Sequence, residues 1–200
     1  MDFLDHVLLG VRDLEAAADR IRREWGLGTV PGGSPAPGVV NAVVPLEPPV
    51  YLELVTAVDA RASEAATRLA DATAHGDRLF TWAIEPRALD ARAATLGIEP
   101  SSGGGDTGRW RLLGEVGRDR PFFIEYDVAR AGRVAGWRRA YAEAEHDRAP
   151  GRVTWLEVGG DESRLRPWTG DIDVPVRWVG GEPRLAGVGI ATSSGEIVVR

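Results

Sequence analysis

Two glutamates in otherwise apolar stretches are the residues of this chain best suited to chemistry. Glu53 is fourth in the stretch Val50–Glu53, and Glu125 is fourth in Phe122–Glu125. Apolar and aromatic neighbours favour a buried strand. A carboxylate on such a strand is costly unless a metal, a cation or a proton partners it. If both carboxylates face one cavity without a metal, they should share a proton, which raises the pKa of at least one of them.

A second strand-like stretch precedes each glutamate. Asp5–Leu9 comes before Glu53 and carries His6, and Phe80–Ile84 comes before Glu125 and carries Thr81 and Trp82. A helix-like segment follows each of these earlier strands, and aligning the two helices places His6 over Thr81. The chain therefore contains one strand–helix–strands unit at least twice, with an acidic residue at the same place in both copies.

The repeat divides the chain into segments. We expect paired units at 1–56 and 77–128, a connector helix at 59–75, and a second connector helix plus a third related unit in 129–200. Within the second unit, 101–105 (Ser-Ser-Gly-Gly-Gly) is expected to be a flexible loop. Such repetition predicts an α+β fold whose units pair to complete a curved sheet. The third unit lacks the histidine and the mid-strand glutamate, so we expect it either to pad the sheet edge or to form a homodimer interface.

Composition excludes several classes of function. A net charge of −6 argues against a nucleic-acid-binding surface, which needs clustered positive charge. The chain has no cysteine, which removes disulfides, thiolate metal sites and cysteine nucleophiles. No apolar run has membrane-spanning length and the N-terminus lacks the pattern of a signal peptide, so we expect a cytoplasmic protein without a membrane partner.

Three motifs carry a resemblance to a known superfamily: Leu4–Leu14 (LDHVLLGVRDL), Tyr51–Val55 (YLELV) and Phe122–Tyr126 (FFIEY). With them the chain resembles the vicinal oxygen chelate superfamily, which includes glyoxalase I, extradiol dioxygenases and bleomycin-resistance proteins. The tryptophan-rich third unit makes it most similar to the glyoxalase-like domain branch. The resemblance implies paired βαβββ units that form a curved mixed sheet, or cup, in which catalytic members hold one divalent metal.

The resemblance also implies site residues. The metal positions of the superfamily fall on His6, Glu53, Thr81 and Glu125. His6, Glu53 and Glu125 would be the ligands, and one imidazole with two carboxylates suits Zn²⁺, Mn²⁺, Fe²⁺ or Ni²⁺. Thr81 stands where catalytic relatives usually have histidine, which either leaves a position open for water or substrate or marks a site that has lost its metal. In a metal-dependent reaction the ion would act as a Lewis acid and Glu125 as the base.

Four further residues are candidates for contact with a substrate. Thr81 and Trp82 lie on the strand aligned with that of His6, and Arg109 and Arg111 alternate with Trp110. The arginines either bind an anionic substrate inside the cup or point outward to water.

Three functions stay open at the level of sequence. The first is a glyoxalase-like enzyme of the lyase, isomerase or dioxygenase kind, acting on a small oxygenated metabolite. The second is a module of the bleomycin-resistance kind that sequesters a small-molecule ligand without chemistry. The third is a scaffold with a vestigial site. In that case His6 is a structural histidine whose ring nitrogens are hydrogen-bonded within the protein, and the two glutamates face water.

Overall fold

The computed structural model describes residues 1–105, 108–118 and 120–200, and these residues form the expected α+β fold. The first unit runs through β1 (Phe3–Gly10), α1 (Leu14–Trp25), β2 (Val30–Pro31), β3 (Val39–Pro45) and β4 (Tyr51–Ala57). After α2 (Glu64–Thr73), the second unit runs through β5 (Arg78–Glu85), α3 (Leu89–Leu96), β6 (Ser101–Gly105), β7 (Gly108–Leu113) and β8 (Phe122–Tyr126). No helix in the described part of the chain is long and apolar enough to cross a membrane.

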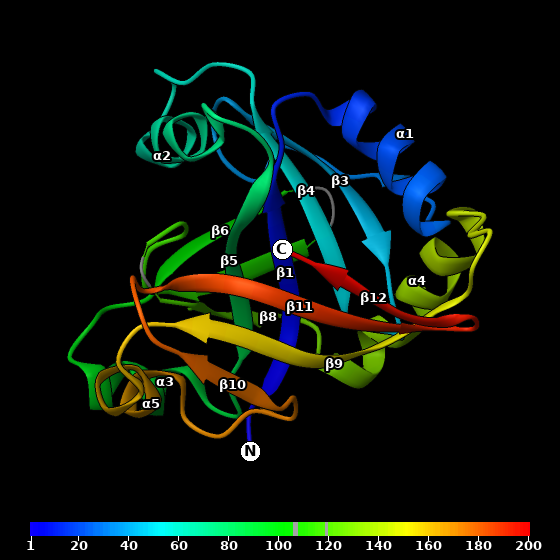
Figure 1. Cartoon of the computed structure of the whole chain (residues 1–200). Helices are drawn as coiled ribbons and strands as arrows, with labels where there is room; N and C mark the ends of the chain where they lie inside the picture. The colour runs from blue at the N-terminus through cyan, green and yellow to red at the C-terminus, as the bar shows by residue number, and fades with distance from the viewer. Residues whose placement is uncertain (106–107, 119) are drawn as a thin grey trace.

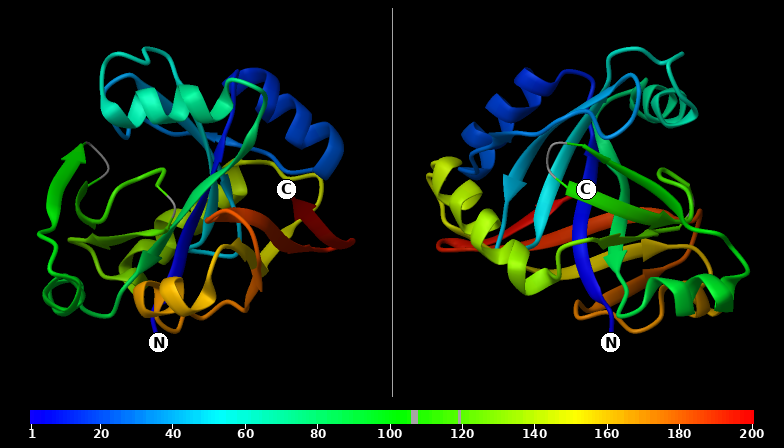
Figure 2. Two further views of the ribbon diagram at one scale, coloured as in Figure 1. Left: turned by 60° about the vertical axis from the view of Figure 1, so that its left-hand side comes forward. Right: turned by 180° about the vertical axis from the view of Figure 1, so that it is seen from behind.

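The two units pair their strands in the same way within one curved eight-stranded sheet (Figures 1 and 2). The strand order is β2-β3-β4-β1-β5-β8-β7-β6. In each unit the first and last strands are parallel, β1 with β4 and β5 with β8, and the antiparallel pair β1–β5 joins the units. This is the predicted pairing of two βαβββ units.

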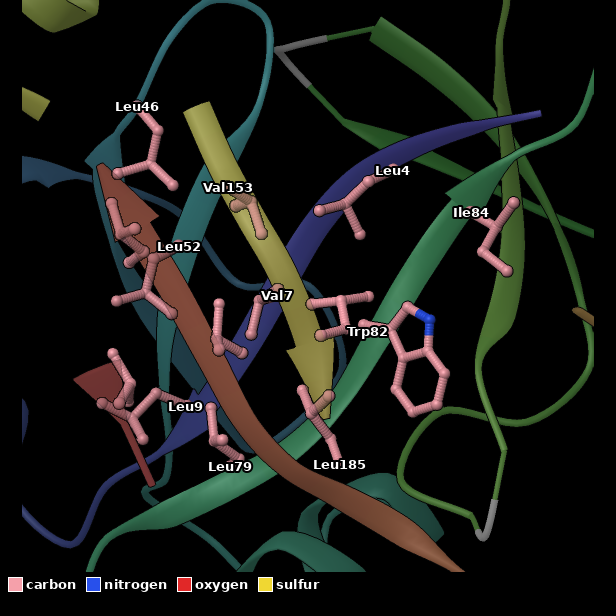
Figure 3. Close-up of a cluster of buried hydrophobic side chains, with 14 of the residues drawn as sticks. Leu4, Val7, Leu9, Leu46, Leu52, Leu79, Trp82, Ile84, Val153 and Leu185 are labelled. Atoms are coloured by element: carbon pink, nitrogen blue, oxygen red, sulfur yellow. The ribbon is translucent and has the colours of Figure 1, made fainter. Parts of the chain in front are cut away.

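The C-terminal region runs through α4 (Arg130–Glu143), β9 (Pro150–Gly159), α5 (Glu162–Thr169), β10 (Val176–Val179), β11 (Arg184–Thr192) and β12 (Gly195–Val199). It repeats the element order of the other units, but its separate sheet has the order β10-β9-β11-β12. Figure 3 shows Val153 and Leu185 of this sheet facing the apolar side chains of β1, β4 and β5. The third unit therefore covers a face of the large sheet rather than its edge, and a homodimer interface on it stays a prediction.

The helices divide between the two faces of the large sheet. Side chains of α1, α3 and α5 join the hydrophobic core that the second sheet also covers, on what we call the outer face. Ala66 and Leu69 of α2 instead pack with Leu8 and Val55 on the opposite face, which we call the cup face. The cup face therefore has α2 over one part, and a stack between Tyr51 and Trp137 brings α4 over another.

The glycine-rich segment 101–105 is strand β6, not the expected loop. It pairs antiparallel with β7 at the edge of the large sheet. The aromatic ring of Trp110 lies so close to Gly103 that any side chain at this position would collide with it. The glycine therefore permits the close approach of a ring, a common reason for glycine within a strand.

Candidate functional site

The registers of β1, β4 and β5 place three predicted site residues on the cup face. His6 lies beside Tyr51 on β4, and Leu8 lies between Glu53 on β4 and Thr81 on β5. Alternation along β4 sends Tyr51 and Glu53 to the same face. The sheet therefore brings His6 and Glu53 together, with Thr81 one strand further along.

A chain of hydrogen-bonding groups runs through His6. Its Nδ1 lies 2.7 Å from Oδ1 of Asp5, and its Nε2 lies 3.4 Å from Oε2 of Glu53. The amide of Asn41 donates a hydrogen bond to Oε1 of Glu53. Asp5, His6 and Glu53 are all buried. Because Asp5 accepts from Nδ1–H, a hydrogen bond between Nε2 of His6 and Oε2 of Glu53 requires a proton on one of these two atoms.

Aromatic rings surround the imidazole. The ring of Tyr51 stacks on His6 with centroids 4.6 Å apart, and Trp137 of α4 stacks on Tyr51 at 4.3 Å. Phe122 contacts His6 edge-on at 5.7 Å. The Tyr126 hydroxyl donates to Oδ1 of Asp5 over 2.9 Å. Burial raises the pKa of both Tyr51 and Tyr126 well above 10.0, so both hydroxyls stay protonated.

Asp5 is a buried, ionised carboxylate that contacts the side of the His6 ring away from Glu53. Burial by itself would raise its pKa, but the hydrogen bond from His6, the nearby charges of His6 and Arg133, and the Tyr126 hydroxyl together hold that pKa below 3.8. Arg133 of α4 lies 3.2 Å from Asp5 and also pairs with Glu85. The ionised carboxylate therefore ties β1 to α4 and fixes the orientation of the His6 ring.

Glu125 lies on the outer face, away from His6 and Glu53. The Nε of Arg111 donates to its carboxylate over 2.9 Å, and Arg111 also pairs with Asp90 of α3. Strand register explains the difference. The repeat that places His6 over Thr81 also places Leu8 over Ala83. Leu8 pairs with Glu53 on β4, whereas Ala83 pairs with Phe122 on β8. The counterpart of Glu53 on β8 is thus Phe122. The expectation that Glu53 and Glu125 face one cup is wrong.

The other predicted contact residues also divide between the faces. Thr81 lies on the cup face, and its buried hydroxyl has no hydrogen-bond partner among the described residues. Trp82 belongs to the core of the outer face and does not line the cup. Arg109 is exposed and Arg111 is held by Glu125 on the outer face, so of the two readings for these arginines the outward one holds.

The residues present do not fit the metal of catalytic superfamily members. In the described ranges, no group of three or more His, Asp or Glu is placed to hold a metal ion. His6 and Glu53 supply two ligands, and their atoms already contact each other, Asp5 and Asn41. Strand β8 presents Phe122 and Ile124 to the cup where the predicted third ligand would stand.

Sequence reasoning missed several residues of this site. Asp5 and Asn41 carry a usable signal, because each is a polar residue within an apolar strand, at positions 3–10 and 39–45. Tyr126 lies in a quoted motif, but only its hydrogen bond to Asp5 indicates a role. Arg133 gives no signal in the sequence, since its helix reaches Asp5 through tertiary packing.

The paired βαβββ units and the cup define the chain as a member of the vicinal oxygen chelate superfamily. The sequence profile described as "Glyoxalase-like domain" matches residues 4–193, and the chain belongs to that family. A comparison with curated proteins finds no match.

Comparison with solved structures finds similar chains at low sequence identity. A hypothetical protein from Staphylococcus aureus is similar with a TM-score of 0.67 and 14% identity, covering 92% of this chain and 88% of that one. A variant of methylmalonyl-CoA epimerase from Streptomyces coelicolor has a TM-score of 0.48 and 18% identity, over 62% and 95% of the two chains. The methylmalonyl-CoA epimerase of Mycobacterium tuberculosis has 0.46 and 19%, over 64% and 88%.

Proposed function

We propose that the cup binds a small oxygenated metabolite over the His6–Glu53 pair, without a resident metal ion. The observation that carries this proposal is the polar pair on the cup face, held from behind by Asp5 and Asn41. Buried polar groups normally serve either structure or a ligand. A ligand hydroxyl or carbonyl would hydrogen-bond to the pair in place of a metal.

The difference in burial between the two faces supports a ligand site. On β4, Tyr51 and Glu53 of the cup face keep 8% and 6% of their surface exposed, whereas Leu52 and Leu54 of the outer face keep 0%. Tyr51 and Glu53 therefore keep slightly more contact with solvent than the outer-face residues beside them.

Thr81 is a further polar residue of the cup face, separate from the His6–Glu53 pair. It flanks Leu8 on one side and Glu53 flanks it on the other, so the two polar residues are two strand spacings apart, about 10 Å between backbones. The Thr81 hydroxyl has no partner among the described residues. Leu8 lies between the two polar groups and packs against α2, so a small ligand over the His6–Glu53 pair would not also contact Thr81.

A second candidate function is proton transfer at a carbon atom next to a carbonyl. The line from Asp5 through His6 to Glu53 favours it, because such a line can take a proton and return it. Glu53 would be the base, the role that the sequence reasoning assigned to Glu125. Asp5 would act as a positioning residue that fixes the ring of His6.

Calorimetry with small hydroxy and keto acids, in the presence of a chelator, tests the first proposal. We expect saturable binding to the wild type, at least about tenfold weaker binding to Glu53→Gln, and unchanged binding to the matched control Glu125→Gln. Equal affinity of both variants, or binding that appears only when a divalent metal is added, would overturn it.

Proton transfer has its own readout. If a bound acid exchanges the hydrogen next to its carbonyl for deuterium in D₂O, nuclear magnetic resonance of the ligand will show the loss of that signal. Glu53→Gln should abolish the exchange and Glu125→Gln should preserve it. Binding without exchange in the wild type supports sequestration instead.

A further inference from the structure

A second concave site lies between α2, β5 and the start of β11. Its cavity measures about 910 Å³ and lies within the ~300–1,000 Å³ range of pockets that hold organic ligands. None of His6, Glu53 or Thr81 lines it. The cavity is thus separate from the cup, and we call it the arginine cleft.

The floor of the arginine cleft is apolar and partly aromatic. Leu79, Phe80 and Trp168 belong to it. Leu79 and Trp168 are buried, and the indole N–H of Trp168 donates to the carbonyl of Pro121 over 2.8 Å, which fixes the position of the ring. The guanidinium of Arg120 stacks over the Trp168 ring at 4.3 Å, so the half-buried ring of Phe80 is the aromatic surface that a ligand can contact.

The rim of the cleft is positively charged in a protein whose net charge is −6. Its lining contains five arginines, namely Arg68, Arg78, Arg118, Arg120 and Arg184. Among the described residues of the lining, the carboxylates are Asp71, Glu99 and Glu115, and Glu115 is already paired with Arg118 at 2.8 Å and lies 3.7 Å from Arg68. Among these described residues arginines outnumber carboxylates, the reverse of the chain as a whole.

Two of these arginines are available to a ligand. Arg78 and Arg184 are exposed and have no ion-pair partner in the part of the chain that the structure describes. Guanidinium groups bind phosphate oxygens through two parallel hydrogen bonds, which gives both strength and orientation. Several guanidinium groups around one cleft suit a doubly charged phosphate better than a single carboxylate.

We propose that the arginine cleft binds an organic phosphate, with the phosphate on the Arg78 and Arg184 side and the apolar part against Phe80. This site is independent of the function proposed for the cup.

Titration calorimetry with 1-naphthyl phosphate tests the proposal, with 1-naphthol and inorganic phosphate as probes for the two parts. We expect 1-naphthyl phosphate to bind most tightly, and Arg78→Gln and Arg184→Gln each to weaken its binding about tenfold. Arg139→Gln, an equal loss of charge on the exposed face of α4, is the matched control and should leave affinity unchanged.

Three outcomes would overturn the proposal: no saturable binding, equal losses in Arg78→Gln and Arg139→Gln, or equally tight binding of inorganic phosphate alone. Glu53→Gln separates this result from that of the cup, because it should not change the affinity for 1-naphthyl phosphate.

Discussion

Glu53 in β4 and Glu125 in β8 occupy the same place in two similar stretches, yet they lie on opposite faces of one sheet. Glu53 faces the cup beside His6, and Glu125 faces outward beside Arg111. A shift of strand register by an odd number of residues moves every side chain of the strand to the other face. Similar stretches in repeated units therefore do not ensure equivalent positions.

The surroundings of the two glutamates differ as much as their faces. The side chain of Glu53 is 7% exposed and that of Glu125 is 34% exposed. Ion pairs in contact with water contribute little to stability, typically ~0–1 kcal/mol. A buried charge that loses its partner costs far more, ~3–5 kcal/mol. We therefore expect loss of the carboxylate to lower the stability of the protein more at Glu53 than at Glu125.

The substitution expected to have the largest effect is Asp5→Asn. Asn cannot carry the charge that His6 and Arg133 face, so we expect the free energy of unfolding to fall by ~3–5 kcal/mol. Denaturant unfolding measures the change. Asp90→Asn, which alters the exposed partner of Arg111, should lower the free energy of unfolding far less. Similar costs for the two variants would contradict the contrast between the faces.

A direct comparison of Glu53→Gln with Glu125→Gln comes next in size. Glu53→Gln should lower the free energy of unfolding by ~1–3 kcal/mol, since it weakens a buried charged contact with His6. Glu125→Gln should lower it by less than ~1 kcal/mol, because its partner Arg111 is in contact with water. Thermal and denaturant unfolding of both variants measure these changes. A larger loss of unfolding free energy in Glu125→Gln than in Glu53→Gln would contradict our assignment of the faces.

The pH dependence of stability gives the smallest and most specific effect. The pKa of folded Asp5 lies below 3.8, so its contribution is complete above that pH and is lost as pH falls through the folded pKa. The pKa values of Tyr51 and Tyr126 are raised above 10.0, so their contribution is complete below pH 10 and is lost at higher pH. Each unit of displacement corresponds to ~1.4 kcal/mol.

Urea unfolding across the acid and alkaline ranges tests these signs. Asp5→Asn should flatten the acid limb, and Tyr126→Phe should flatten part of the alkaline limb. An unchanged acid limb in Asp5→Asn would mean that another carboxylate controls it.

The sequence by itself determined the paired units and much of their local structure. Asp13 caps α1 by accepting from the amide of Ala16, and Gly26 ends that helix in the left-handed conformation, positions that both residue types favour. The superfamily resemblance implied the position of His6 near Glu53, whereas the alternation of β4 by itself puts Tyr51 and Glu53 on one face. These features depend on contacts between residues close in sequence, or on a pattern that one strand carries alone.

Only the tertiary structure decided on which face Glu125 lies and which distant residues contact Asp5. The pairing of Ala83 with Phe122 sets which side chains of β8 enter the cup, and it depends on how two distant strands align. Arg133 reaches Asp5 because α4 packs back onto the first strand. Alternation tells which residues of a strand share a face, but strand register and packing between distant elements decide which face that is.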